Sequence, residues 1–204
     1  MADFLSYLRQ PAMPEPVLKG ARVVLRPPRL DDFGQWAALR AESRDFLQPW
    51  EPTWPPDDLT AVAWRRRLRS YWRELREGTA LPLLVFDRQT QGLLGGLTLS
   101  NIRRGNAQAG TLGYWIGARH ARQGYMTEAV RLLLDHAFGS LGLHRVEAAC
   151  LPENEPSRRL LEKCGFWREG YARGYLNING EWRDHLLYAI LAESWQTADG
   201  NRDA

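Results

Sequence analysis

The sequence has few cysteines and no long apolar run. Cys150 and Cys164 are the only cysteines among 204 residues, too few for a disulfide-stapled fold, and their apolar neighbours are typical of small core residues in a reducing compartment. No stretch approaches the roughly 18 apolar residues of a membrane-spanning helix. The first residues lack the basic start and apolar run of a secretory signal peptide. We therefore expect a cytoplasmic protein without a membrane segment.

Histidine and strong net charge are also scarce. The four histidines have no cysteine or carboxylate at metal-ligand spacing: His120, His136, His144 and His185. This pattern predicts no metal site and no catalytic triad. The net charge of +3 is mild, so it suits an anionic cofactor but does not by itself indicate a nucleic-acid-binding protein.

Length and composition indicate one domain. The chain is 44% hydrophobic and 25% charged, which is ordinary for a globular protein with a sizeable core. It contains no repeat and no convincing linker. We expect residues 1–204 to form a single domain, with a proline-rich extended arm over residues 1–20 and a flexible tail over residues 193–204.

The order of apolar segments predicts an α/β domain. Seven segments read as strands: 23–28, 81–86, 93–102, 110–117, 146–151, 167–178 and 181–191. Four helices are expected, one capped by Asp31, one capped by Asp57 or Asp58, and two over residues 126–140 and 155–163. The prolines of residues 46–58 predict an ordered loop. Asn179–Gly180 predicts a tight hairpin between the last two strands.

Residues 110–140 predict a site for an anion. An apolar strand is followed by a short basic loop containing Gly124 and by an amphipathic helix that opens at Met126 or Thr127. A helix start presents free N–H groups and positive dipole to a phosphate. Gly124 permits close backbone approach, Arg122 can meet phosphate charge, and the Thr127 hydroxyl can donate to it. The alternative is a strand-to-helix turn that binds no ligand.

Residues 150–166 form a second strand–helix unit. The helix starts at an Asn and a Pro and stops at a glycine, with its main positions being Asn154-Glu155-Pro156-Ser157, Leu160-Leu161 and Cys164-Gly165-Phe166. Taken alone, Asn154 reads as a helix cap and Ser157 as a first-turn serine without a task. Two consecutive strand–helix units with an anion site in the first favour a cofactor-dependent transferase over a plain binding module.

Together these units resemble the GNAT superfamily of acetyl-CoA-dependent N-acetyltransferases over about residues 20–192. In that family the loop carries the pattern Arg/Gln-x-x-Gly-x-Gly/Ala. Here only the central Gly124 matches strictly, because Ala121 and Met126 replace the outer positions. Thr127-Glu128-Ala129 and the segment SRDFLQPWEPTWPPDDLT resemble the bacterial ribosomal-protein-alanine N-acetyltransferase branch. The resemblance implies a GNAT-type mixed, mostly antiparallel central sheet of about six to seven strands flanked by four main helices.

The resemblance also implies acetyl-CoA as cosubstrate, without a metal. It places the pyrophosphate on the residues Arg122, Gln123, Gly124, Tyr125, Met126 and Thr127. Backbone N–H groups near Tyr114, Trp115 and Ile116 would receive the thioester carbonyl, as an oxyanion hole does. By the same resemblance, Asn154 binds the pantetheine arm and Ser157 lies beside the thioester sulfur.

The sequence offers three candidate catalytic residues. Family members transfer the acetyl group by direct attack in a ternary complex, and many use a tyrosine seven residues after the Asn, where this chain has Leu161. Ser157 is then the best proton donor and Tyr175 a weaker one, unless Tyr175 only packs. Glu51 is a candidate base or amine-binding carboxylate, with an exposed loop glutamate as the alternative.

The resemblance favours the N-terminal alanine of a ribosomal protein as acceptor. A small amine, such as an aminoglycoside, a polyamine or an amino acid, is one alternative. A non-catalytic acyl-CoA-binding, ribosome-associated factor is another. The arginine-rich helix over residues 65–76 is either a solvated face or a contact with ribosomal RNA. The chain could be a monomer or a homodimer.

Overall fold

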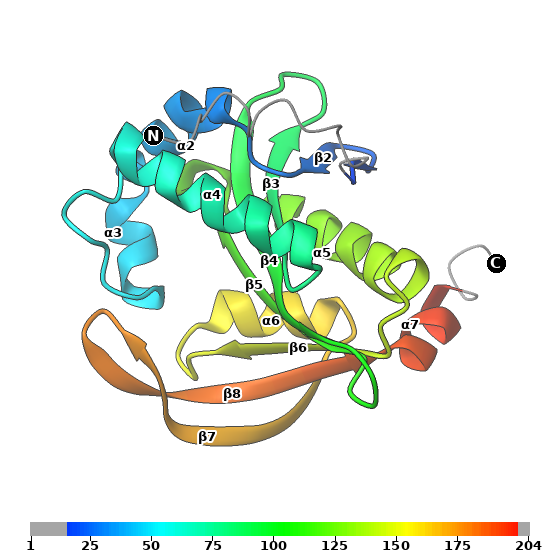
Figure 1. The fold of residues 1–204 in the computed structure, drawn as a ribbon. Coiled ribbons are helices and arrows are strands. Elements are labelled where there is room, and N and C mark those ends of the chain that lie inside the picture. Colours follow the sequence, from blue (N-terminus) through cyan, green and yellow to red (C-terminus); the bar gives the residue numbers. More distant parts are fainter. Residues whose placement is uncertain (1–15, 200–204) are drawn as a thin grey trace.

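The computed structural model describes residues 16–199 and contains one mixed sheet of eight strands (Figure 1). In the order β1-β2-β3-β4-β5-β6-β8-β7, the pairing is antiparallel except between β5 and β6, which run parallel. The strands are β1 (Leu18–Lys19), β2 (Val23–Arg26), β3 (Leu81–Asp87), β4 (Leu93–Arg103), β5 (Ala109–Ile116), β6 (Arg145–Cys150), β7 (Trp167–Ile178) and β8 (Glu181–Leu191). The predicted mixed, mostly antiparallel α/β sheet is confirmed, with one strand more than the expected maximum, because β1 forms within the predicted arm.

Helices cover both faces of this sheet. They are α2 (Phe33–Glu42), α3 (Arg44–Leu47), α4 (Ala61–Glu77), α5 (Tyr125–Asp135), α6 (Glu155–Lys163) and α7 (Ala192–Asp199). The four predicted main helices are α2, α4, α5 and α6. A π-helical turn over His136–Ser140 continues α5 and accounts for the remainder of the helix predicted over residues 126–140.

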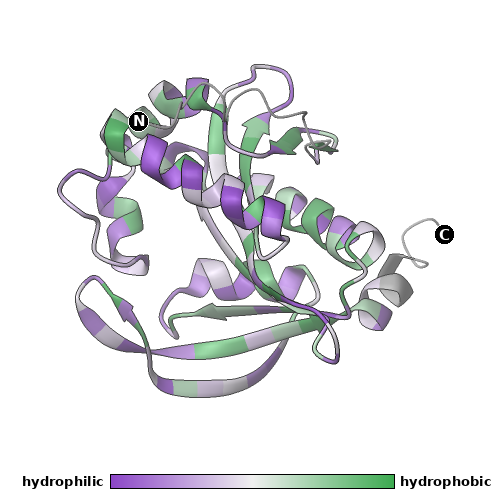
Figure 2. Cartoon of the chain, in the orientation of Figure 1, coloured by the Kyte–Doolittle hydropathy of each residue, from purple (hydrophilic) through white to green (hydrophobic). Residues whose placement is uncertain are grey.

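Two apolar clusters hold the layers together. The larger cluster packs α5 and α6 against one face of the sheet, and the smaller one packs α2 and α4 against the other. Val130, Leu133 and Leu134 of α5 are fully buried in the larger cluster. The outward side of α4 is hydrophilic, as its amphipathic sequence requires (Figure 2). Because α5 is fixed by three fully buried side chains, its first turn has a defined place at the end of β5.

The parallel strands β5 and β6 separate before they end. Their pairing runs from Ala109 opposite Arg145 to Leu112 opposite Ala148 and then stops, while β5 continues to Ile116. We call the space between residues 113–116 and the end of β6 the β5–β6 gap. Both α5 and α6 begin just after one of these two strands, so the gap and two helix starts lie at the same edge of the fold.

The C-terminal segment differs from its prediction. Residues 193–204 were expected to be a flexible tail, but α7 covers Ala192–Asp199 and residues 200–204 lie outside the described part. Trp195 explains the difference: its side chain is buried in the larger cluster, and its Nε1 donates to Asp135 Oδ1 at 2.7 Å. Of the predicted arm, residues 1–15 also lie outside the described part, and Leu18–Lys19 form β1.

The expected helix caps are shifted. Thr60 rather than Asp57 or Asp58 caps α4, because its Oγ1 accepts from Ala63 N at 3.2 Å while the two aspartates pair with arginines one to two turns into the helix. Asp32 rather than Asp31 directly precedes α2; it is the last residue of a 3-10 turn, and its side chain forms no cap hydrogen bond with α2. The segment 46–58, predicted to lack regular structure, begins with the end of α3 and another 3-10 turn at Gln48–Trp50.

Candidate active site

The start of α5 forms a cradle of free backbone N–H groups. Gly124 is the residue before the helix and has φ +82°, and the first bond across the cap runs from Glu128 N to Gly124 O at 3.1 Å. The N–H groups of Tyr125, Met126 and Thr127 therefore have no acceptor within the helix. Such a set of donors, together with the positive end of the helix dipole, fits a pyrophosphate.

The side chains of this loop divide by role. Arg122, with φ +60°, is exposed and forms no ion pair with any described residue, so its guanidinium is available to an anion. Gln123 Nε2 donates to Arg119 O at 2.8 Å and closes the loop on itself. The Met126 side chain is buried in the core, which explains how a large residue replaces a small one while the backbone N–H stays in place.

A residue that the sequence did not single out supports the cradle from behind. Arg22, just before β2, donates from Nη1 to Gln123 O at 3.1 Å and pairs with Glu128 Oε2 at 3.1 Å. The Glu128 carboxylate also accepts from Arg22 N at 2.7 Å, and the Arg22 guanidinium lies 4.9 Å from the centre of the Tyr125 ring. These contacts hold the loop against β2, more than 100 residues away in sequence.

Backbone groups of β5 face the β5–β6 gap. Gly117 N donates to Leu94 O of β4 at 2.9 Å, and the Trp115 carbonyl lies so close to Gly95 that a Cβ there would come within 2.3 Å of it. Residues 115 and 117 therefore point their backbone groups at β4. Because N–H groups alternate along a strand, those of Tyr114 and Ile116 face the gap. The Trp115 ring lies on the other face, 5.0 Å from the Arg40 guanidinium.

The first turn of α6 lies on the opposite side of this gap. Asn154 Oδ1 accepts from Ser157 N at 3.2 Å, so the capping interpretation of Asn154 is confirmed. Its side-chain amide N–H groups are left for a ligand. Ser157 Oγ lies 2.7 Å from the Tyr114 hydroxyl, which reaches across from β5. Tyr114 was predicted to contribute only backbone groups, so its hydroxyl is a site group that the sequence pattern did not indicate.

Burial sets the protonation of the groups around Ser157. It raises the pKa of the Tyr114 phenol far above its usual range, and the hydrogen bond with Ser157 opposes this only in part. Burial also raises the pKa of the Cys150 thiol to about 11, again opposed by a hydrogen bond with Ser157. Both groups therefore keep their protons at neutral pH.

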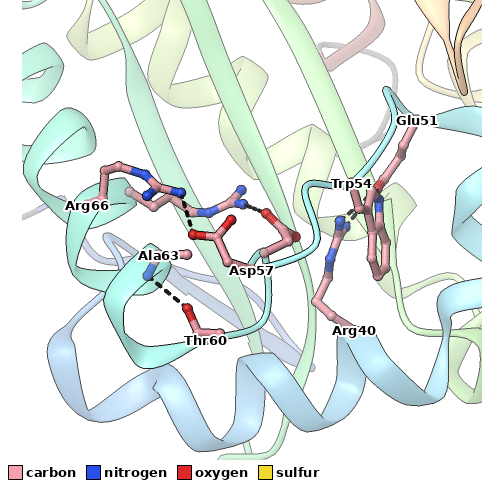
Figure 3. A network of polar contacts seen from close by, with 9 residues as sticks. Arg40, Glu51, Trp54, Asp57, Thr60, Ala63 and Arg66 are labelled. Carbon is pink, nitrogen blue, oxygen red and sulfur yellow. Dashed lines mark hydrogen bonds and ion pairs between the residues drawn. The ribbon is translucent and has the colours of Figure 1, made fainter.

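The Glu51 side chain lies against Arg40 and Trp54 (Figure 3). Its two carboxylate oxygens each accept from Arg40 at 2.7 Å, and Oε2 also accepts from Trp54 Nε1 at 2.7 Å. The Arg40 guanidinium in turn lies 4.1 Å from the centre of the Trp54 ring. We call Arg40, Glu51, Trp54 and Trp115 the aromatic–arginine cluster. It borders the end of β5 on the face opposite α6.

The hairpin between β7 and β8 meets the loop that carries Glu51. Asn179 N donates to Glu51 O at 2.9 Å, and Gln48 Nε2 donates to Asn179 Oδ1 at 3.4 Å. Asn179 and Gly180 both have positive φ, as the predicted hairpin turn requires. Farther along this hairpin, Tyr175 is 46% exposed, forms no hydrogen bond with any described residue, and packs its ring 5.6 Å from that of His185. No hydrogen bond joins Tyr175 to Ser157.

The arginines of α4 differ in their surroundings: Arg65, Arg66 and Arg69 are exposed, whereas Arg67 is partly buried and lies 5.0 Å from the centre of the Trp36 ring. Arg66 pairs with Asp57 at 3.2 Å and Arg67 with Asp58, whereas Arg65 and Arg69 are exposed and have no ion pair within the described chain. The surface therefore combines a solvated face with unpaired charge. Among residues 16–199, no group of histidine, cysteine and carboxylate side chains has the arrangement of a metal site. Within the same residues, no helix combines the length and apolarity that a membrane span requires.

This edge of the fold fits a class of protein that binds an extended anionic ligand. It has free backbone N–H groups that suit a pyrophosphate, a gap between two parallel strands, and a serine at one side of that gap. The acetyltransferase (GNAT) domain family matches residues 22–167. The chain is 38% identical over 175 residues to the probable N-acetyltransferase YjcK of Bacillus subtilis, covering 86% of this chain and 97% of that one. It is 34% identical over 183 residues to the ribosomal protein uS5-alanine N-acetyltransferase of Escherichia coli, covering 90% and 94%.

Solved structures agree with these matches. The ribosomal-protein-S5-alanine acetyltransferase of Vibrio fischeri superposes with a TM-score of 0.82 at 31% identity, covering 89% of this chain and 99% of that one. Mycobacterium smegmatis RimJ, solved in complex with CoA-disulfide, superposes with a TM-score of 0.80 at 34% identity, covering 91% and 92%. The chain belongs to the GNAT family and is an acetyl-CoA-dependent N-acetyltransferase.

Proposed function

We propose that this enzyme acetylates the N-terminal α-amine of a protein, and that its acceptor is the N-terminal alanine of a ribosomal protein. The observation that carries the proposal is the aromatic–arginine cluster. An acceptor side built for a cationic small molecule needs carboxylates free to pair with it, whereas the Glu51 carboxylate already accepts three hydrogen bonds. The tryptophans beside it suit a peptide, and two relatives that share most of the chain carry this acceptor in their names.

The acidity of the acceptor points the same way. An N-terminal α-amine has a pKa near 7.7–8.0, so roughly a third of it is neutral at pH 7.5, against about one lysine side chain in a thousand. The enzyme therefore needs no strong base for an α-amine. The Glu51 carboxylate is already engaged by Arg40 and Trp54 and is a poor base. An amine that loses its proton to water is therefore the acetyl acceptor that fits this site best.

In this proposal the residues of the chain bind acetyl-CoA and orient its thioester. The N–H groups of Tyr125, Met126 and Thr127, with Arg122, would hold the pyrophosphate, and Asn154 the pantetheine arm. Bound acetyl-CoA supplies an acetyl group as a thioester, whose C–S bond breaks with the electron pair left on sulfur as the amine nitrogen bonds to carbon. The N–H groups of Tyr114 and Ile116 would stabilise the carbonyl oxygen, and the Ser157 hydroxyl the sulfur.

Direct attack by the amine is favoured over an acetylated enzyme. Covalent catalysis needs a nucleophile with a nearby base or a lowered pKa. Cys150 has a raised pKa, and Ser157 has a neutral phenol as its neighbour rather than a base. Neither side chain is activated, so the amine itself must attack the thioester. A ribosomal acceptor would place the enzyme in the cytoplasm. It would also give an RNA surface to Arg65 and Arg69, which form no ion pair with any of residues 16–199.

A panel of acceptors tests the proposal. The purified chain would be given acetyl-CoA with three acceptors: a peptide starting with alanine, the same peptide with its N-terminus blocked and a lysine added, and a polyamine. Release of CoA would be followed with a thiol reagent, and the modified nitrogen identified by mass spectrometry. We expect turnover with the free N-terminus and a kcat/KM at least about 100-fold lower for the other two, in line with the neutral fractions above.

Each outcome has a meaning. Preferred turnover of the polyamine would replace the peptide acceptor with a small molecule. Turnover of the blocked peptide would make the enzyme a lysine acetyltransferase. Tight binding of CoA without turnover of a broad range of amines would contradict catalysis and support an acyl-CoA-binding factor.

Substituting Ser157 with alanine tests its place in the reaction. We expect kcat to fall by a factor of about 10–100, because a hydrogen bond to a developing negative charge is lost, while acetyl-CoA affinity changes less. The substitution is mild for the fold, since Asn154 caps α6 through the backbone N–H of residue 157 and not through its hydroxyl. Steady-state kinetics beside calorimetric binding gives both quantities, and an unchanged kcat would remove Ser157 from the mechanism.

A further inference from the structure

We infer that Tyr114 is a positioning residue for Ser157: its phenol donates a hydrogen bond to Ser157 Oγ and so directs the serine's own proton toward the thioester sulfur. This inference rests on the proposed role of Ser157. The resemblance implies that many relatives donate the proton to the thiolate from a tyrosine at the position of Leu161. This chain lacks that tyrosine, and the inference gives Tyr114 a role in orienting the donor that replaces it.

The geometry joins the two sides of the gap. Tyr114 extends from β5, and Ser157 lies in the first turn of α6, 43 residues later in the sequence. The phenol oxygen is 2.7 Å from Ser157 Oγ and 3.4 Å from the Ser157 carbonyl oxygen. Both contacts are to one residue, so the tyrosine fixes the position of Ser157 and of nothing else polar in the described chain.

The direction of the hydrogen bond follows from burial. The Tyr114 side chain is partly buried, and the loss of water around its phenol raises the pKa, so the phenol is neutral and has one proton to donate. The only acceptors that it reaches in the described chain are the two oxygens of Ser157, and the hydroxyl oxygen is much the nearer. The phenol therefore donates, and the Ser157 hydroxyl accepts.

The serine proton is then free to point elsewhere. A hydroxyl has one proton and two acceptor lone pairs, so accepting from Tyr114 leaves the proton available. The other protein group beside the Ser157 hydroxyl is the Cys150 thiol, which stays protonated and is a weak acceptor. The sulfur of the departing CoA carries a full negative charge and is a stronger acceptor than the Cys150 thiol. The Ser157 hydroxyl will therefore donate to the CoA sulfur in the β5–β6 gap rather than to Cys150.

The test is a double-mutant cycle of Tyr114→Phe and Ser157→Ala, with Tyr188→Phe as the matched control. Tyr188 is a buried tyrosine of the cluster against which Tyr114 packs, but its hydroxyl donates to Glu162 Oε1 at 3.3 Å and does not contact Ser157. We expect Tyr114→Phe to lower kcat about fivefold in the parent enzyme and to have no effect once Ser157 is alanine. Tyr188→Phe should leave kcat unchanged in both backgrounds.

A binding measurement separates positioning from activity. Calorimetry at mildly alkaline pH would compare CoA with desulfo-CoA, which lacks the sulfur. We expect Tyr114→Phe and Ser157→Ala each to reduce the preference for CoA, the double variant to reduce it no further, and desulfo-CoA affinity to stay constant.

Three results would overturn the inference. They are an unchanged kcat in a folded Tyr114→Phe, equal effects of that change with and without Ser157, and an unchanged preference for CoA. An unchanged kcat in Ser157→Ala alone would instead contradict the proposed role of Ser157. Thermal denaturation of each variant shows whether it folds, and the desulfo-CoA affinity remains a readout where stability falls.

Discussion

The variant Gly124→Val should bind acetyl-CoA at least about tenfold more weakly than the parent enzyme. Gly124 has φ +82°, a region that β-branched residues avoid, so valine must move the backbone that aims three N–H groups at the pyrophosphate. A Cβ at this position also comes within 3.1 Å of Nη2 of Arg22, the residue whose Nη1 donates to the neighbouring Gln123 carbonyl. Strain and crowding therefore act on the same loop.

Gly78→Val is the matched control for this experiment. Gly78 ends α4 with φ +67° and nothing lies within 4 Å of its Cβ position, so valine there meets similar strain away from the cradle. Both variants should lose stability, but only Gly124→Val should raise the acetyl-CoA KM and the calorimetric Kd. If both constants stayed at their parent values in a folded Gly124→Val, the cradle would not be the cofactor site.

Local patterns were enough to predict where the site elements lie. Gly124 and Asn154 each stand at a strand-to-helix junction, and such junctions can be recognised from apolar periodicity and helix-start residues. Periodicity also predicted seven of the eight strands. Periodicity does not tell which junctions meet. The resemblance implied a mixed sheet, but the parallel pairing of β5 with β6 that brings these two junctions together was not predicted.

Partners far apart in sequence could not be predicted. Arg22 meets Glu128 across 106 residues, and Tyr114 meets Ser157 across 43. A weak signal existed for two of the missed residues. Tyr114 lies in an otherwise apolar strand and Arg40 follows the buried Leu39 in α2, and a buried hydroxyl or guanidinium needs a partner. That signal predicts that a partner exists without saying which residue it is.

Replacing Glu51 with leucine should destabilise the fold by about 3 kcal/mol, the largest stability effect that we expect from one surface-loop change. The Arg40 side chain is only 7% exposed, and its Nε already lacks a hydrogen-bond partner within the described chain. Leucine would leave the guanidinium buried without its carboxylate, which costs far more than an exposed pair is worth. Urea denaturation followed by tryptophan fluorescence measures the loss.

The exposed pair of Asp57 and Arg66, seen beside the cluster in Figure 3, supplies the control. Because both side chains are about half exposed, Asp57→Asn should change stability by less than about 1 kcal/mol. A loss as small as this in Glu51→Leu would mean that Arg40 finds water or another partner, and the cluster would not be a structural unit.

Glu51→Gln decides between the two roles of this residue. Glutamine is close to glutamate in shape, but it lacks the negative charge and cannot take a proton at neutral pH. If Glu51 only anchors the loop, kcat should stay within about threefold of the parent, while stability falls less than in Glu51→Leu. A fall of about 100-fold in kcat with the fold retained would make Glu51 the base. If Glu51 only anchors the loop, the proton of the attacking amine leaves through water. This requires that the amine which accepts the acetyl group is already partly neutral, and an N-terminal α-amine meets that requirement where a lysine side chain does not.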